Sequence, residues 1–156
     1  MYFASVLLLT LVLPLASIFV DHSLMQNVLP LMVLVGKWFA FWAGGVRLFI
    51  AGWRQLFQPR FTSETIFGIK SDDPLPFVRE LGMANISMGT IGIVCVCVPA
   101  FVLPAAIASG LYYGFAGVGH VVHGGRNLER NVAMASDLFV ALMLLSYAGW
   151  AAASYL

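Results

Sequence analysis

Five polar or ionisable side chains occur inside runs of sequence that are otherwise apolar. They are Arg47, Glu80, Asn85, His120 and Asp137. An arginine or aspartate at the centre of a membrane helix costs about 2.5–3.5 kcal/mol on insertion scales, so such residues usually face inward and pair with one another. Because a guanidinium group forks well onto a carboxylate, we expect Arg47 to pair with Glu80 or Asp137.

The five side chains are expected to form a cluster at one depth of the molecule. Arg47 precedes Arg54 by two helical turns, and Asp137 follows the predicted helix start at Val132 by five residues. At 1.5 Å per residue, Arg47, Glu80, His120 and Asp137 all lie about 7–10 Å from the same end of the bundle. Two interpretations remain open, namely pairs that only stabilise the bundle and a polar pocket that opens in the cytoplasmic half.

Catalytic and metal-binding motifs are not recognisable in this sequence. His120 and His123 share a helix face, but no further histidine or carboxylate follows at chelating spacing, so we expect no metal or haem. No nucleophile elbow and no glycine-rich phosphate loop occurs, and no enzyme class is therefore predicted. No cofactor is expected, although a quinone or another lipophilic ligand would suit a polar pocket of this kind.

The composition indicates a protein that is surrounded by lipid. Of the residues, 61% are hydrophobic and only 10% are charged, whereas a soluble domain carries about 25% charged residues. The net charge of +1 and the lack of a basic stripe exclude nucleic acid as an expected partner. The molecule cannot cover itself with charge, so lipid must take the place of water.

The apolar runs predict a single all-α domain over residues 1–156, a transmembrane helical bundle with five spans. The spans cover approximately residues 2–20, 37–57, 74–98, 105–123 and 132–155. Residues 24–36 either extend the second span or form an interfacial segment. The first run has no preceding Lys or Arg, and we expect a retained helix rather than a cleaved signal peptide.

Basic residues predict the orientation of the bundle. They occur between spans two and three and between spans four and five, at Arg54, Arg60, Lys70, Arg79, Arg126 and Arg130, whereas the turn between spans three and four has none. The positive-inside rule then predicts a cytoplasmic N-terminus. A bundle of four spans with Met1 outside is the alternative if the first segment does not cross.

Small residues recur at helical spacing in three of the predicted spans, where they allow two backbones to approach closely. The stripes contain Gly44, Gly45 and Gly52 in the second span, Gly82, Gly89 and Gly92 in the third, and Ala106, Gly110 and Gly114 in the fourth, with Ala108 and Gly117 nearby. These stripes predict a compact bundle.

Several segments resemble a known group of proteins. They are Lys37-Trp38-Phe39, Gly44 to Phe49, Gly52-x-Arg54-Gln55, Phe57-x-Pro59, Ile66-Phe67-Gly68, Arg79 to Asn85 and Asp137-Leu138-Phe139. Together they resemble an uncharacterised family of small bacterial integral membrane proteins. The last four helices are more distantly similar to the DoxX-like membrane proteins. That likeness implies a small subunit associated with quinone-linked redox complexes.

Two functions follow as hypotheses. The first is a small accessory subunit of the bacterial cytoplasmic membrane, which packs against a larger, quinone-linked complex or against itself. The second is a membrane protein or enzyme that binds a lipophilic ligand in a polar pocket of the cytoplasmic half. Membrane lipids are expected partners in both cases.

Overall fold

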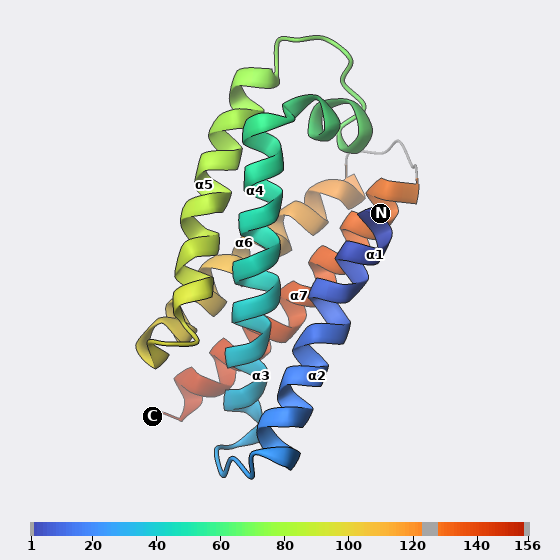
Figure 1. Cartoon of the computed structure of the whole chain (residues 1–156). Coiled ribbons are helices and arrows are strands. Elements are labelled where there is room, and N and C mark those ends of the chain that lie inside the picture. Colours follow the sequence, from blue (N-terminus) through green and yellow to red (C-terminus); the bar gives the residue numbers. More distant parts are fainter. Residues whose placement is uncertain (1, 123–127, 155–156) are drawn as a thin grey trace.

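The computed structural model describes residues 2–122 and 128–154, and the regular elements in these ranges are all helices. The helices run alternately up and down in Figure 1. The N-terminus, the connection between α4 (Leu48–Phe57) and α5 (Leu75–Val94), and the facing ends of α6 (Val102–Val122) and α7 (Leu128–Ala153) lie toward one end. The connection between η2 (Val20–Leu24) and α3 (Leu31–Phe39) and the end of α7 lie toward the other end.

The first two long rods are continuous helices that contain π-helical turns. The first comprises α1 (Tyr2–Leu7), η1 (Leu8–Val12), α2 (Leu13–Phe19) and η2 (Val20–Leu24). The second comprises α3 (Leu31–Phe39), η3 (Ala40–Arg47) and α4 (Leu48–Phe57). In the first rod Pro14 explains the π-helical segment η1. Proline lacks an N–H, and its ring clashes with the carbonyl four residues earlier.

The remaining elements complete the bundle. A short π-helix, η4 (Phe61–Ile66), follows α4 and precedes the long helix α5 (Leu75–Val94). A 3₁₀ turn, η5 (Pro99–Phe101), leads into α6 (Val102–Val122), and α7 (Leu128–Ala153) is the last helix.

These bounds correct the second predicted span, which begins at residue 31 instead of 37. The segment left open, residues 24–36, is thus divided between the end of η2, a connection and the start of α3. The predicted ends at residues 123 and 155 lie outside the described residues.

Four helical rods in the described ranges are long and apolar enough to cross a membrane. They are Tyr2–Leu24, Leu31–Phe57, Pro99–Val122 and Leu128–Ala153. The predicted third span corresponds to α5, which is not among them. That helix carries Arg79, Glu80, Asn85, Ser87 and Thr90, and these polar residues lower its apolar character. The fold is therefore an all-helical bundle of the multi-pass membrane type.

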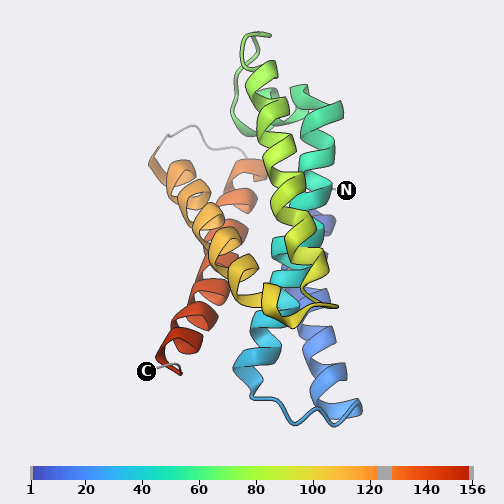
Figure 2. The same cartoon turned by 90° about the vertical axis from the view of Figure 1, so that its left-hand side faces the viewer.

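Glycines allow α5 to approach the second rod very closely. A Cβ atom added to Gly92 would lie 2.6 Å from the Cα of Gly45, and one added to Gly52 would lie 2.5 Å from the carbonyl oxygen of Gly82. A Cβ atom added to Gly89 would lie 2.6 Å from the backbone nitrogen of Phe49. The close-approach faces predicted for these two helices are thus confirmed, and they place α4 and α5 side by side in both views (Figures 1 and 2).

A second tight pair is formed by α6 and α7, which cross beside the α4–α5 pair in Figure 2. Gly110 faces the side chain of Leu145, and Gly117 faces that of Leu138. The stripe predicted on α6 therefore makes a helix contact, whereas Ala108 is exposed on the outer side of that helix. These contacts bring the polar residues of α6 and α7 toward the second rod.

Candidate functional site

Arg47 and Asp137 form a buried ion pair between the second rod and α7. The Nη2 atom of Arg47 donates to Oδ1 of Asp137 at 2.7 Å, and the side chains are 12% and 8% exposed. The same Nη2 also donates to the hydroxyl of Ser136 at 3.0 Å. Of the two carboxylates expected as partners of Arg47, the structure therefore selects Asp137.

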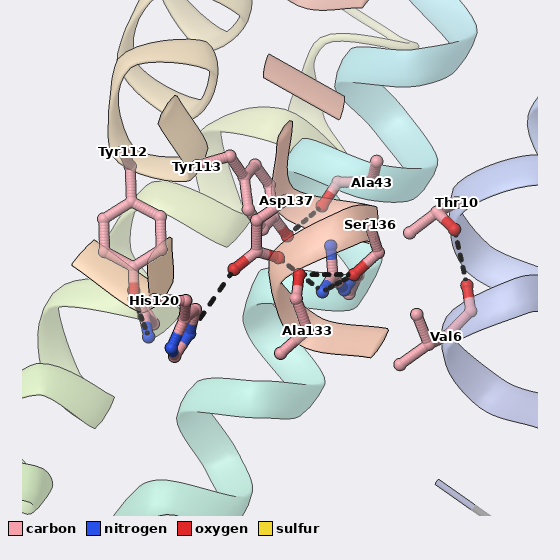
Figure 3. A network of polar contacts seen from close by, with 11 residues as sticks. Val6, Thr10, Ala43, Tyr112, Tyr113, His120, Ala133, Ser136 and Asp137 are labelled. Atoms are coloured by element: carbon pink, nitrogen blue, oxygen red, sulfur yellow. Dashed lines mark hydrogen bonds and ion pairs between the residues drawn. The ribbon is translucent and has the colours of Figure 1, made fainter. Parts of the chain in front are cut away.

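Tyr113 of α6 packs against this ion pair. The guanidinium carbon of Arg47 lies 4.8 Å from the centre of the Tyr113 ring, which is a cation–π contact. The Tyr113 hydroxyl donates to the carbonyl oxygen of Ala43 at 2.8 Å, which ties α6 to η3. Figure 3 shows Tyr113, Asp137 and Ser136 close together around this pair. Tyr113 was not singled out from the sequence, although it lies two helical turns before His120.

His120 lies on the other side of Asp137, as Figure 3 shows. Its Nε2 atom is 4.0 Å from Oδ2 of Asp137, and its side chain is 11% exposed. This distance is too long for a hydrogen bond. Asp137 therefore has Arg47 at one oxygen and His120 at the other, and the carboxylate links α6, α7 and the second rod.

Asn85 of α5 forms a second polar group near the same level. Its Nδ2 atom donates to Oε1 of Gln55 at 2.8 Å and to the hydroxyl of Tyr112 at 3.0 Å. Asn85 is 1% exposed, so these bonds stabilise a buried amide between α4, α5 and α6. Gln55 and Tyr112 were also missed, because neither side chain is charged.

A cavity of about 860 Å³ joins these groups. Its walls come from α1, η3, α4, η4, α5, α6 and α7, and most of them are apolar. The polar and ionisable residues in the lining include Arg47, Arg54, Gln55, Asn85, Tyr112, Tyr113, His120, Arg130 and Asp137. Four of the five residues singled out from the sequence thus contribute to one cavity.

Arg47 and Asn85, which both line the cavity, each have a buried polar atom without a hydrogen-bond partner. Within the described residues, Nη1 of Arg47 and Oδ1 of Asn85 are buried and make no hydrogen bond. Buried polar atoms are nearly always hydrogen-bonded in proteins, because an unmade bond costs about 1–3 kcal/mol. The two residues thus keep an unused donor and an unused acceptor beside the cavity.

Glu80 does not belong to this cluster. Its side chain is exposed on α5 and does not contribute to the cavity. The depth estimate placed it at a similar level but did not resolve which face of α5 it occupies. Asn85, five residues later, faces the second rod instead. His123 lies outside the described residues.

A third polar cluster lies near the opposite end of the first two rods, and it was not predicted. Oδ2 of Asp21 accepts hydrogen bonds from Lys37 Nζ at 2.8 Å and from Trp38 Nε1 at 2.9 Å. Oδ1 accepts from Asn27 Nδ2 at 2.7 Å. The signal in the sequence is a single acid and a single lysine at the facing ends of two consecutive helices. This cluster attaches the first rod to the second.

In the described ranges, no three residues among His, Cys, Asp and Glu lie close enough together to hold a metal ion. The lining of the cavity offers hydrogen-bonding groups, charge and apolar contact to a bound molecule.

A family model matches residues 1–154, and the chain belongs to this family, which is described as a family of unknown function, DUF6790. This agrees with the expected membership of an uncharacterised family. No curated protein and no solved structure matches the chain.

Proposed function

We propose that this protein binds a lipophilic ligand in the cavity between α1, the second rod, α6 and α7. The observation that carries the proposal is the cavity of about 860 Å³ with mostly apolar walls and a few polar groups. Ligand sites are typically clefts of about 300–1,000 Å³ with this division between apolar lining and a small number of orienting polar groups.

The rim of the cavity supports access from the bilayer. Ile50 on α4 is 52% exposed and Phe115 on α6 is 75% exposed, and both contribute to the lining. Phe67 and Ile69, which follow η4, are also exposed lining residues. Apolar side chains that face both the cavity and the lipid provide a route by which a lipophilic molecule enters without crossing water.

The alternative, in which the polar cluster only stabilises the bundle, does not account for the unpaired donor and the adjacent cavity. A purely structural ion pair needs all its hydrogen-bonding groups satisfied, because partly satisfied buried networks are costly. Here the Arg47–Asp137 pair stands beside a large space and keeps a free donor at Nη1. Both features are those of a site that receives a further partner.

The accessory-subunit hypothesis, with its DoxX-like resemblance and quinone-linked complex, stays a prediction. It requires a defined protein partner on the outside of the bundle, and co-purification from native membranes tests it. The two hypotheses are compatible, because a subunit of a larger complex can itself hold a lipophilic ligand.

For the membrane arrangement we propose five spans and a cytoplasmic N-terminus, in a bacterial cytoplasmic membrane. The lipid-facing hydroxyls of α5 support its crossing, because Ser87 and Thr90 donate to carbonyls of their own helix. Arg54 in the last turns of α4, Arg60 and Lys70 in the connection that follows, and Arg130 in the first turn of α7 belong to segments that lie toward one end of the bundle in Figure 1, which supports the orientation. The bacterial location rests on the resemblance alone.

A titration with a fluorescent lipophile tests the binding function. The protein is reconstituted in nanodiscs of phosphatidylcholine and titrated with pyrene-labelled hexadecyl amphiphiles, in acid and alcohol forms. Ala116 lines the cavity, whereas Ala108 lies on the same helix and is exposed outside it. We expect saturable binding of at least one form. Ala116→Phe should weaken this binding at least about tenfold, which corresponds to about 1.4 kcal/mol. Ala108→Phe should leave the binding unchanged. Equal binding by all three proteins contradicts the proposal.

A further inference from the structure

The charged residues that line the cavity are unequal in number. Among the described residues the lining contains three arginines, Arg47, Arg54 and Arg130, and a single carboxylate, Asp137. Asp137 is paired with Arg47. The described carboxylate of the lining is therefore already engaged, and Arg54 has no carboxylate partner among the described residues.

Arg54 carries a positive charge at the wall of the cavity. Its guanidinium carbon lies 3.5 Å from the centre of the Phe61 ring, and within the described residues it forms no ion pair. Arg60 lies just beyond it and has carboxylates available, because it pairs with Asp72 at 2.8 Å and with Glu64 at 3.5 Å. The connection thus provides carboxylates to an exposed arginine, while Arg54 contacts an aromatic ring beside an apolar cavity.

Arg54 and Arg47 belong to the same wall. They are separated by seven residues of regular helix, which is two turns and about 10 Å of rise. Arg47 has a buried donor without a partner at Nη1, and Arg54 contacts the Phe61 ring rather than a carboxylate. Arginine presents planar, paired N–H donors that match the geometry of carboxylate and phosphate groups.

Building on the proposed function, we propose that the ligand is an amphiphile with an anionic headgroup, a carboxylate or a phosphate. Arg54 and Nη1 of Arg47 hold the headgroup, and the apolar chain lies against side chains such as Leu9, Ile50 and Leu81. A fully neutral lipid would leave the charge of Arg54 without a counterion beside the apolar lining. An anion supplies that counterion without displacing Asp137.

Competition among four hexadecyl compounds tests this inference on the reconstituted protein. The compounds are hexadecanoic acid, hexadecyl phosphate, hexadecanol and methyl hexadecanoate, each displacing the pyrene-labelled acid. We expect the acid, the phosphate or both to displace the probe at concentrations about tenfold lower than the alcohol and the ester. The stronger competitor of the two anions shows whether the site prefers a carboxylate or a phosphate headgroup.

Matched variants separate a headgroup site from a general effect of positive charge. Arg54→Gln weakens binding of the preferred anion by about tenfold, and Arg54→Lys restores part of it. Arg79→Gln removes a charge from an exposed position of α5 outside the cavity and leaves binding unchanged.

The possible results distinguish this inference from the function on which it rests. If the alcohol and the ester compete as well as the anions, or if Arg54→Gln has no effect, the anionic headgroup is wrong while lipophile binding stands. If no compound displaces the probe and the probe does not saturate, both proposals fail.

Discussion

The guanidinium of Arg47 and the carboxylate of Asp137, ninety residues apart in the chain, meet at 2.7 Å in the interior of the bundle. Their contact joins the second rod to α7, and Tyr113 adds α6 through its ring and its hydrogen bond to Ala43. The pair also forms part of the cavity lining. One interaction therefore links the packing of three helices to the proposed binding site.

Removing one partner of this pair should destabilise the bundle strongly. In Asp137→Asn the charge of Arg47 remains buried without a counterion, and breaking a buried pair in this way costs about 3–5 kcal/mol. The free energy of unfolding in mixed micelles measures the effect. Asp73→Asn, at an exposed position of the connection before α5, should change it by less than about 0.5 kcal/mol.

The double variant Arg47→Met, Asp137→Leu gives the second half of this test. Replacing both charges by apolar groups should recover most of the lost stability, because a buried pair is often no more stable than apolar side chains of similar volume. A double variant as unstable as Asp137→Asn would show that the loss does not come from an unpaired charge.

Gly92 should not tolerate even a methyl group. A Cβ atom there would lie 2.6 Å from both Cα and N of Gly45, and neither backbone atom can move away alone. We expect Gly92→Ala to lower the free energy of unfolding by about 1–3 kcal/mol, as overpacking does. Gly149→Ala, where nothing lies within 4 Å, should raise it by up to about 1 kcal/mol through helix propensity. Equal effects at both positions would contradict the close helix contact.

Asp21 should control the attachment of the first rod. It accepts three hydrogen bonds, from Lys37, Trp38 and Asn27. In Asp21→Ala these donors lose their acceptor, and hydrogen exchange should accelerate in α2 and η2 while α5 keeps its protection. Uniform acceleration across the whole bundle would indicate global destabilisation rather than release of one rod.

The proposed orientation can be measured with single cysteines in a background where Cys95 and Cys97 are replaced by alanine. Val28 is 97% exposed in the connection before α3, and Ser71 is exposed in the connection before α5. In intact cells an impermeant maleimide should label Val28→Cys, whereas Ser71→Cys should react only after permeabilisation. The reverse pattern would place the N-terminus outside, and labelling of both would mean that the second rod does not cross.

Apolar runs and glycine spacing were sufficient to predict the helical bundle and the contact between α4 and α5. Helix ends were less predictable. The sequence of residues 31–36 is compatible both with an extension of the second span and with an interfacial segment. The π-helical turns were not predicted either. Near Pro14 such a turn follows from the missing N–H, whereas η3 ends at Arg47 and has no comparable marker in its sequence.

For the site, counting residues from helix ends predicted depth but not direction. That procedure correctly brought Arg47, His120 and Asp137 to one level. It also included Glu80, whose exposure depends on the rotation of α5, and this rotation is determined by the glycine contacts with the second rod. The neutral partners Gln55 and Tyr112 became recognisable only when the helices were placed together.

Native mass spectrometry of protein extracted gently from its membrane tests the central claim, a cavity that binds a lipophilic ligand, most directly. The account predicts that the wild-type protein and Ala108→Phe retain one molecule of a lipophilic compound per chain, and that Ala116→Phe has lost it. Retention of the same compound in the same proportion by all three proteins would contradict the account, because the bound molecule would then lie outside the cavity.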